Sequence, residues 1–162
     1  MDEEVEEFAA KMSEPGKTQE MDELKERVKE LNCFYRISEI VKDEDLSPDR
    51  ALQEIAETLP PSWQYEDITC ARIKVGDKEF TTEGFEETQW KQESGIELEG
   101  EKVGSVQVFY KEEKPERDEG PFLKEERRLI DAISELIGSF VEEKRVKERL
   151  KERTEKEPKG PE

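Results

Sequence analysis

The sequence predicts an α+β protein with a central antiparallel sheet of at least four strands, packed by helices. Three observations support this fold class. Near both ends of the folded part, apolar residues recur at intervals of three and four, as in amphipathic helices. In the middle of the chain they alternate with polar residues, as in strands, and glycines mark turns between consecutive strands. We expect the long N- and C-terminal helices to form a helical bundle.

The length of 162 residues predicts one domain with extensions, because domains usually contain about 100–150 residues. Only 31% of the residues are hydrophobic, but these are concentrated between Met21 and Leu150, where they can build a modest core. The predicted parts are a loosely ordered acidic tail (1–20), a single domain with terminal helices (21–153) and a flexible tail (154–162).

Helical periodicity predicts two helices in the first part of the domain. The first begins near Met21, after a break signal at Pro15-Gly16. Its first half carries a narrow apolar stripe with alternating spacings of four and three, made of Leu24, Val28, Leu31 and Tyr35. The second helix is expected to begin at Ser47-Pro48, an N-cap followed by proline at the first helical position, and to end at Pro60-Pro61.

The central segments are predicted to be strands joined by tight turns. The first strand covers residues 68–75. Its two faces are formed by Ala71, Ile73 and Val75 and by Ile68, Cys70 and Arg72. Gly76-Asp77 predicts a two-residue type II′ turn into a return strand at 79–82, because glycine accepts the positive φ that this turn needs. Strands 95–98 and 103–110 are expected to pair across a glycine turn.

A long helix closes the domain. It is expected to open at Pro121, since proline suits the first turn of a helix. Its apolar face includes Leu129, Ile133, Leu136 and Phe140. Past Val141 only Val146 and Leu150 are apolar, so we expect the helix to leave the domain as a charged, solvated rod.

The charge balance restricts the possible partners. The formal net charge is −18, from 45 acidic and 27 basic residues. This charge argues against attachment to nucleic acid or to anionic lipid, and a basic or neutral protein surface is a better match. No apolar run approaches the roughly 20 residues that span a bilayer, and the N-terminus is acidic where a signal peptide would be basic. We therefore expect a cytoplasmic protein with no membrane contact.

The residue types of common active sites are missing from the sequence. The chain contains no histidine, which removes the commonest general base and the commonest zinc ligand, and it has no glycine-rich phosphate loop. The acidic run Asp43-Glu44-Asp45 lacks the spacing of a calcium loop, so a solvated turn is favoured over a magnesium site. We predict no catalytic residue, no metal site and no cofactor. Cys33 and Cys70 are expected to be buried reduced thiols, with a disulfide as the alternative.

Aromatic residues gather around the start of the first strand and the loop after the second. They suggest a partly enclosed pocket for a small molecule, in which Arg72 and Gln92 orient the ligand. The candidate pocket residues are Trp63, Tyr65, Cys70, Arg72, Phe80, Phe85, Trp90 and Gln92. Alternatively, the aromatics fill the core under the loops, and Arg72 is a surface ion-pair residue.

The apolar stripes of the two end helices predict a second kind of site. A symmetric homodimer could bury them in a helical bundle, since narrow heptad stripes need a partner surface. The candidate interface residues are Leu24, Val28, Leu31, Tyr35, Leu129, Ile133, Leu136 and Phe140. The alternative is that the two helices pack against each other within one chain.

Five segments, taken in order, resemble the GAF-related sensory domains of prokaryotic signalling proteins, which occur upstream of PAS and histidine-kinase modules. These segments are residues 31–38, 60–65, 68–73, the spaced Phe80, Phe85, Trp90 and Gln92, and residues 118–127. The resemblance implies a regulatory pocket on one sheet face and terminal helices that dimerise and transmit signals. Because the sequence lacks a phosphoacceptor histidine and an ATP-binding kinase segment, output is expected to pass to a signalling kinase or another effector protein.

The resulting hypothesis is a non-catalytic sensory or regulatory module that binds a small molecule or a partner protein. A structural dimerisation or adaptor module without a ligand is the alternative. An enzyme that uses carboxylates with Mg²⁺ is the third and least favoured possibility.

Overall fold

The structure is a computed structural model that describes residues 15–156. Residues 1–14 and 157–162, which include most of the two predicted tails, lie outside the described residues. The helices are α2 (Pro15–Lys42), α3 (Pro48–Thr58) and α4 (Lys124–Lys156), with short 3₁₀ turns η1 (Pro60–Ser62) and η2 (Glu66–Ile68). The strands are β1 (Thr69–Val75), β2 (Lys78–Thr81), β3 (Lys91–Leu98) and β4 (Glu101–Tyr110). The described chain is therefore α+β, as the sequence predicts.

The four strands form one antiparallel sheet with the order β2-β1-β4-β3. Two tight hairpins fix the register. Gly76 has φ +61° in the turn between β1 and β2, and the following Asp77 has no positive φ, as in the predicted type II′ turn. Glu99 and Gly100 both have positive φ in the turn between β3 and β4. The two central strands, β1 and β4, pair along the whole length of β1.

Strand β3 begins at Lys91, four residues before the predicted start at Gly95. Residues 91–94 are all polar or charged, so they show no apolar alternation that would indicate a strand. They are held instead by pairing with the apolar end of β4, where Lys91 lies opposite Phe109 and Gln92 opposite Val108.

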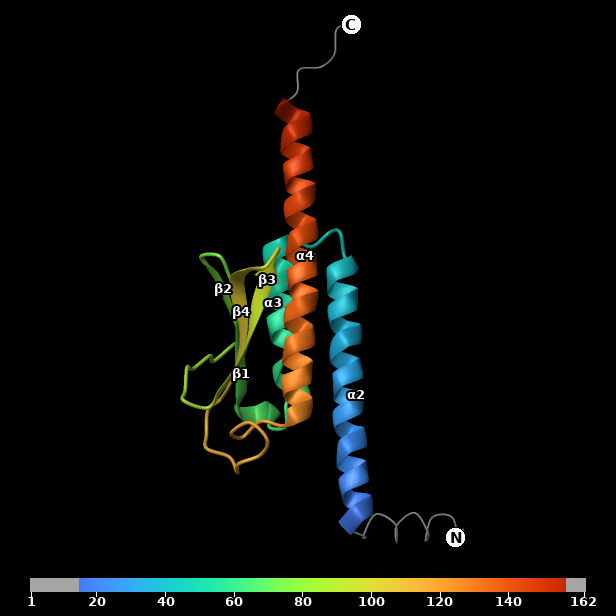
Figure 1. Cartoon of the computed structure of the whole chain (residues 1–162), viewed down its shortest axis with the longest axis vertical. Coiled ribbons are helices and arrows are strands. Elements are labelled where there is room, and N and C mark those ends of the chain that lie inside the picture. The colour runs from blue at the N-terminus through green and yellow to red at the C-terminus, as the bar shows by residue number, and fades with distance from the viewer. Residues whose placement is uncertain (1–14, 157–162) are drawn as a thin grey trace, which may run out of the picture.

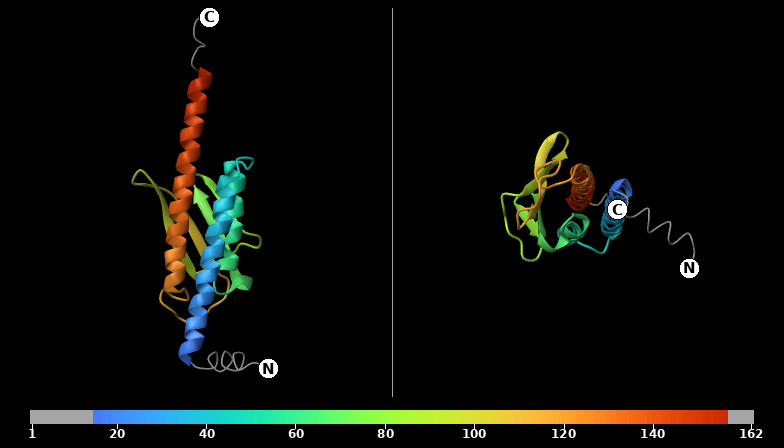
Figure 2. Two further views of the ribbon diagram at one scale, coloured as in Figure 1. Left: turned by 90° about the vertical axis from the view of Figure 1, so that its right-hand side faces the viewer. Right: turned by 90° about the horizontal axis from the view of Figure 1, so that it is seen from below.

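The helices form two layers on one face of the sheet (Figures 1 and 2). Helix α3 packs on β1 and β2, and α4 packs mainly on β3. Helix α2 lies outside them and contacts α3 and α4. Figure 1 shows that α2 and α4 run in the same direction and that α4 continues well past the sheet.

The core lies between the sheet and the inner helix layer. The largest fully buried side chains include Trp63, Tyr110, Phe122, Ile55 and Ile133. Ser47 caps α3 as predicted, because its Oγ accepts a hydrogen bond from the Arg50 backbone N–H at 3.1 Å. Both cysteines are free and buried, and burial raises the pKa of each thiol.

Two helix starts differ from the sequence prediction. Helix α2 begins at Pro15 instead of Met21, because proline has no N–H to lose in the first turn of a helix. Helix α4 begins at Lys124 instead of Pro121. Phe122, which follows Pro121, is buried and stacks on Tyr110 with ring centroids 4.6 Å apart. The backbone of Phe122 pairs with that of Glu119, so residues 119–122 form a turn and the helix begins after it.

A glycine in β4 tests the packing of the sheet. A Cβ on Gly104 would lie 1.9 Å from the carbonyl oxygen of Lys74 in β1. We expect Gly104→Ala to lower the free energy of unfolding by at least about 3 kcal/mol, because the backbone of β1 would have to move. Gly76→Ala, at a positive φ with open space around it, should cost only about 1 kcal/mol. Urea denaturation of both variants measures the difference, and equal losses would contradict this account.

Candidate functional site

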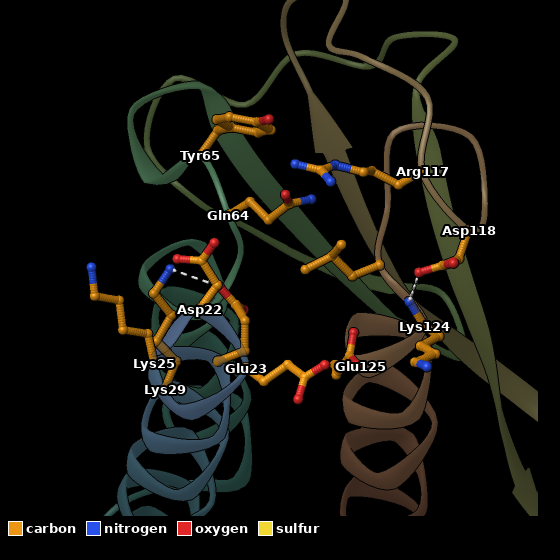
Figure 3. A pocket seen from close by; sticks show the side chains of 12 residues that line it. Asp22, Glu23, Lys25, Lys29, Gln64, Tyr65, Arg117, Asp118, Lys124 and Glu125 are labelled. Carbon is orange, nitrogen blue, oxygen red and sulfur yellow. Dashed lines mark hydrogen bonds and ion pairs between the residues drawn. The ribbon is translucent and has the colours of Figure 1, made fainter. Parts of the chain in front are cut away.

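A cavity of about 700 Å³ lies where the first half of α2 meets the start of α4 (Figure 3). Helix α2 forms one wall, the Gln64-Tyr65 link after η1 forms the second, and the loop before α4 with the first turn of α4 forms the third. The lining residues are Asp22, Glu23, Lys25, Glu26, Lys29, Gln64, Tyr65, Arg117, Asp118, Leu123, Lys124 and Glu125. A molecule bound in this cavity would contact both terminal helices.

The walls of this cavity carry charges of both signs. Lys29 Nζ lies 3.4 Å from Glu26 Oε1 and 3.4 Å from the Trp63 carbonyl oxygen, so it ties α2 to the end of η1. The Asp118 carboxylate accepts a hydrogen bond from the Lys124 backbone N–H at 3.0 Å. Because most of the lining is polar, the cavity suits a small molecule with ionised groups better than an apolar one.

Glu126 is buried beside this cavity and joins three parts of the chain. It is the third residue of α4, and its carboxylate accepts hydrogen bonds from two backbone N–H groups, those of Leu123 and Gln64, each at 2.8 Å. The bond to Leu123 is the glutamate half of a capping box and fixes the start of α4. The Tyr110 hydroxyl of β4 lies 3.4 Å from the same carboxylate.

Among the acidic side chains of the described residues, Glu126 has a pKa that its surroundings raise strongly. The pKa of its carboxyl is raised to about 7: burial is the main cause, the two N–H donors lower the pKa, and the nearby Glu26 carboxylate adds to the increase. Burial also raises the pKa of the Tyr110 hydroxyl, with the Glu126 charge as the second cause. Glu126 therefore changes charge near neutral pH while it holds the base of α4.

This titration predicts a pH-dependent stability. The folded-state pKa of Glu126 lies above that of an unfolded glutamate, so the fold binds the proton more tightly than the unfolded chain does. Its contribution to the free energy of unfolding is complete below about pH 4.5 and is lost as the pH rises through 7, by at most about 3 kcal/mol. We expect Glu126→Gln to flatten this part of the dependence in urea denaturation between pH 5 and pH 8.

Glu125→Gln is the matched control for that measurement, because it removes the same charge from the adjacent residue. Glu125 is only partly buried and lies near Arg128. The control should keep the wild-type pH dependence. The explanation fails if both variants change the dependence equally, since the effect would then come from net charge alone.

The structure distributes the predicted pocket residues over both faces of the sheet. Trp63, Tyr65, Phe80, Trp90 and Gln92 lie on the side of the helices, where they belong to the core or pack against it. Trp63 Nε1 donates a hydrogen bond to Gln92 Oε1 at 3.1 Å inside this core. Of the eight residues, Tyr65 lines the large cavity. The eight therefore do not form a single pocket.

Cys70 and Arg72 lie on the opposite face of the sheet, under the segment of residues 82–90, which contains Phe85. The Arg72 guanidinium lies 5.0 Å from the Phe85 ring centroid and is buried, and it forms an ion pair with the exposed Glu87. The alternative prediction of an ion pair is therefore correct, but the arginine is not at the surface. It donates to Gln107 Oε1 at 2.7 Å and to Glu87 Oε1 at 3.1 Å. The Cys70 thiol contacts the Glu86 carbonyl oxygen at 3.3 Å. These bonds fasten the 82–90 segment to the sheet.

The predicted dimer residues of α2 are exposed along its outer surface. Leu24, Val28, Leu31 and Tyr35 expose 55%, 49%, 60% and 67% of their surface. We call these four residues the α2 stripe. Apolar side chains this exposed at heptad spacing are unusual on a helix that has no further partner.

The predicted dimer residues of α4 are placed differently. Leu129, Ile133 and Phe140 are buried in the core of the chain, and Leu136 is 38% exposed. Helix α4 packs mainly on β3 and also contacts α2 and α3, so these three residues are covered within the chain itself. The interface prediction is corrected accordingly: three of the four α4 residues are unavailable to a partner.

The acidic run after α2 forms a turn. Asp43 Oδ1 accepts a hydrogen bond from the Asp45 backbone N–H at 3.0 Å, and Glu44 pairs with Lys144 and Lys147 of α4. Within residues 15–156, no cluster of three or more potential metal-ligating side chains is present. No helix in the same range is both long and apolar enough to cross a bilayer.

Comparisons with protein-family models, curated proteins and solved structures give no match for this chain. The resemblance to GAF-related domains therefore stays a prediction from the quoted segments.

Proposed function

We propose that this chain is a non-catalytic, GAF-like sensory or regulatory module that forms a symmetric homodimer through α2. In this proposal, a small molecule or partner protein biases the packing of the terminal helices, and α4 carries the change to a signalling kinase or another effector protein. The observation that carries the proposal is the α2 stripe, four large apolar side chains exposed at heptad spacing.

A second copy is the occupant that suits the α2 stripe best. Burying an apolar side chain completely contributes about 1.5–3 kcal/mol, so eight such side chains across a twofold axis supply a substantial driving force. Because α2 and α4 run in the same direction, a parallel dimer brings the two α4 extensions close together. These extensions carry Val146 and Leu150, which are 43% and 58% exposed and four residues apart.

The cavity at the base of α4 supports the sensing part of the proposal. Its walls include residues 22, 23, 25, 26 and 29 of α2 and residues 123–125 at the start of α4. A ligand that binds one packing of these helices more tightly than another shifts the population toward that packing. Since α4 is one continuous helix from Lys124 to Lys156, a shift at its base reaches its far end.

Disruption of the α2 stripe tests the dimer. We expect Leu31→Glu to weaken the dimer at least about tenfold in sedimentation velocity, because it places a charge in the apolar seam. Asn32→Glu is the matched control, since Asn32 is exposed, adjacent and outside the stripe. A wild-type chain that stays monomeric at 100 μM, a concentration of the order used in such experiments, would refute the dimer.

A ligand search tests the sensing part. Native mass spectrometry of the purified protein and a thermal-shift screen of charged metabolites should find a binder that Lys124→Glu weakens. Spin labels on Lys151→Cys, one in each subunit, should then report a changed distance between the α4 ends. A binder that leaves this distance unchanged contradicts transmission, and the absence of any binder contradicts sensing.

A structural dimerisation or adaptor module without a ligand is the second candidate. The burial of Trp63, Phe80 and Gln92 favours it, because these predicted pocket residues are packed in or against the core. Both candidates require the dimer, so the ligand search distinguishes them.

A further inference from the structure

One edge of the sheet remains open beside α4. Strand β3 is terminal in the sheet order, so its outer main-chain groups have no neighbouring strand. Trp90 O accepts a hydrogen bond from Tyr110 N of β4, and the alternation along a strand then directs the main-chain groups of Glu93 and Gly95 outward. The bond from Arg127 Nη1 to Glu93 O, at 2.9 Å, agrees with this alternation.

Helix α4 covers this edge on both sides of Gly95. At one end, Arg127 donates a hydrogen bond to the Glu93 carbonyl oxygen. At the other end Gly138 lies so close that a Cβ on it would be 3.1 Å from Glu97 O. Gly95 lies between these two contacts and is exposed, and no hydrogen bond from its outer N–H or C=O to another described residue is present. The edge is therefore open over a short stretch centred on Gly95.

A groove of about 470 Å³ accompanies this open edge. Ser94, Gly95 and Glu97 form the strand side, and Glu135, Gly138 and Glu142 are among the residues of the α4 side. The groove has the form in which an extended peptide adds to a sheet edge beside a helix.

The lining of this groove is negative, and Lys102 of β4 lies next to it, opposite Glu97 and with its side chain 3.5 Å from the Cβ position of Gly95. Glu97, Glu135 and Glu142 are exposed and form no ion pair with any residue of the described range 15–156. The fourth acid of the lining, Asp131, is already paired with Arg127 and bonded to Ser94. No lysine or arginine is among the lining residues. A segment with cationic side chains is therefore complementary to the groove.

We propose that the groove between β3 and α4 binds an extended basic segment of a partner protein. The segment pairs with the main chain at Gly95 and places lysine or arginine side chains against Glu97, Glu135 and Glu142. A second copy of this chain is disfavoured as the occupant, because it would bring the same three carboxylates to the same groove. The proposal does not depend on the α2 dimer or on a ligand in the large cavity.

A labelled peptide tests the proposal on the full chain. The probe is a fluorescent six-residue peptide of alternating lysine and valine, measured by fluorescence anisotropy at low and at physiological salt. The triple variant Glu97→Lys, Glu135→Lys and Glu142→Lys should weaken binding at least about tenfold. The matched control is Glu83→Lys, Glu148→Lys and Glu152→Lys, which changes the net charge equally at exposed sites outside the groove. It should change the affinity less than about twofold.

The main-chain part of the proposal has its own readout. Hydrogen exchange at the Gly95 amide should slow when the peptide is bound, and a peptide N-methylated at alternate positions should bind at least about tenfold more weakly. Equal losses in the two triple variants would show non-specific attraction to an acidic protein and would overturn the proposal. So would binding without protection of Gly95, or the absence of binding by the wild-type chain.

Discussion

The packing of α4 against the sheet is the constraint on which the rest of the structure depends. Helix α4 packs mainly on β3, and its residues Leu129, Ile133 and Phe140 are buried in the core. Helix α2 is left to the outer layer, with its own stripe uncovered. The same packing brings α4 beside the β3 edge and so creates the acidic groove. The two surfaces proposed here for partners are therefore consequences of one helix–sheet contact.

Glu126 connects this contact to the large cavity. A carboxylate is normally kept at the surface, because burying its charge is costly. Here the Leu123 and Gln64 N–H groups compensate part of this cost, and in return the carboxylate fixes both the start of α4 and the link after η1. A cavity whose two walls are joined through a group that titrates near neutral pH is well placed to respond to what binds in it.

Interactions between neighbouring residues predict the helices, strands and turns, but they do not predict how these elements pack in space. The Ser47 cap and the Gly76 turn depend on adjacent residues, so the sequence predicts them correctly. The stripes of α2 and α4 look alike in sequence, yet only α4 meets the sheet. Strand alternation predicts that Arg72 faces away from Ala71, but it does not reveal that the 82–90 segment covers that face. The partner of Glu126, Gln64, lies 62 residues away, beyond any local pattern.

The part of α4 that projects past the sheet differs in charge from the rest of the molecule. Residues 142–156 contain seven basic and five acidic side chains, in a chain whose formal net charge is −18. At about 1.5 Å per residue this stretch reaches roughly 20 Å beyond the last buried residue, Val141. This stretch therefore carries far less negative charge than the rest of the molecule. A negatively charged partner would meet the least repulsion along the projecting helix, so the charge distribution favours an approach along the helix axis.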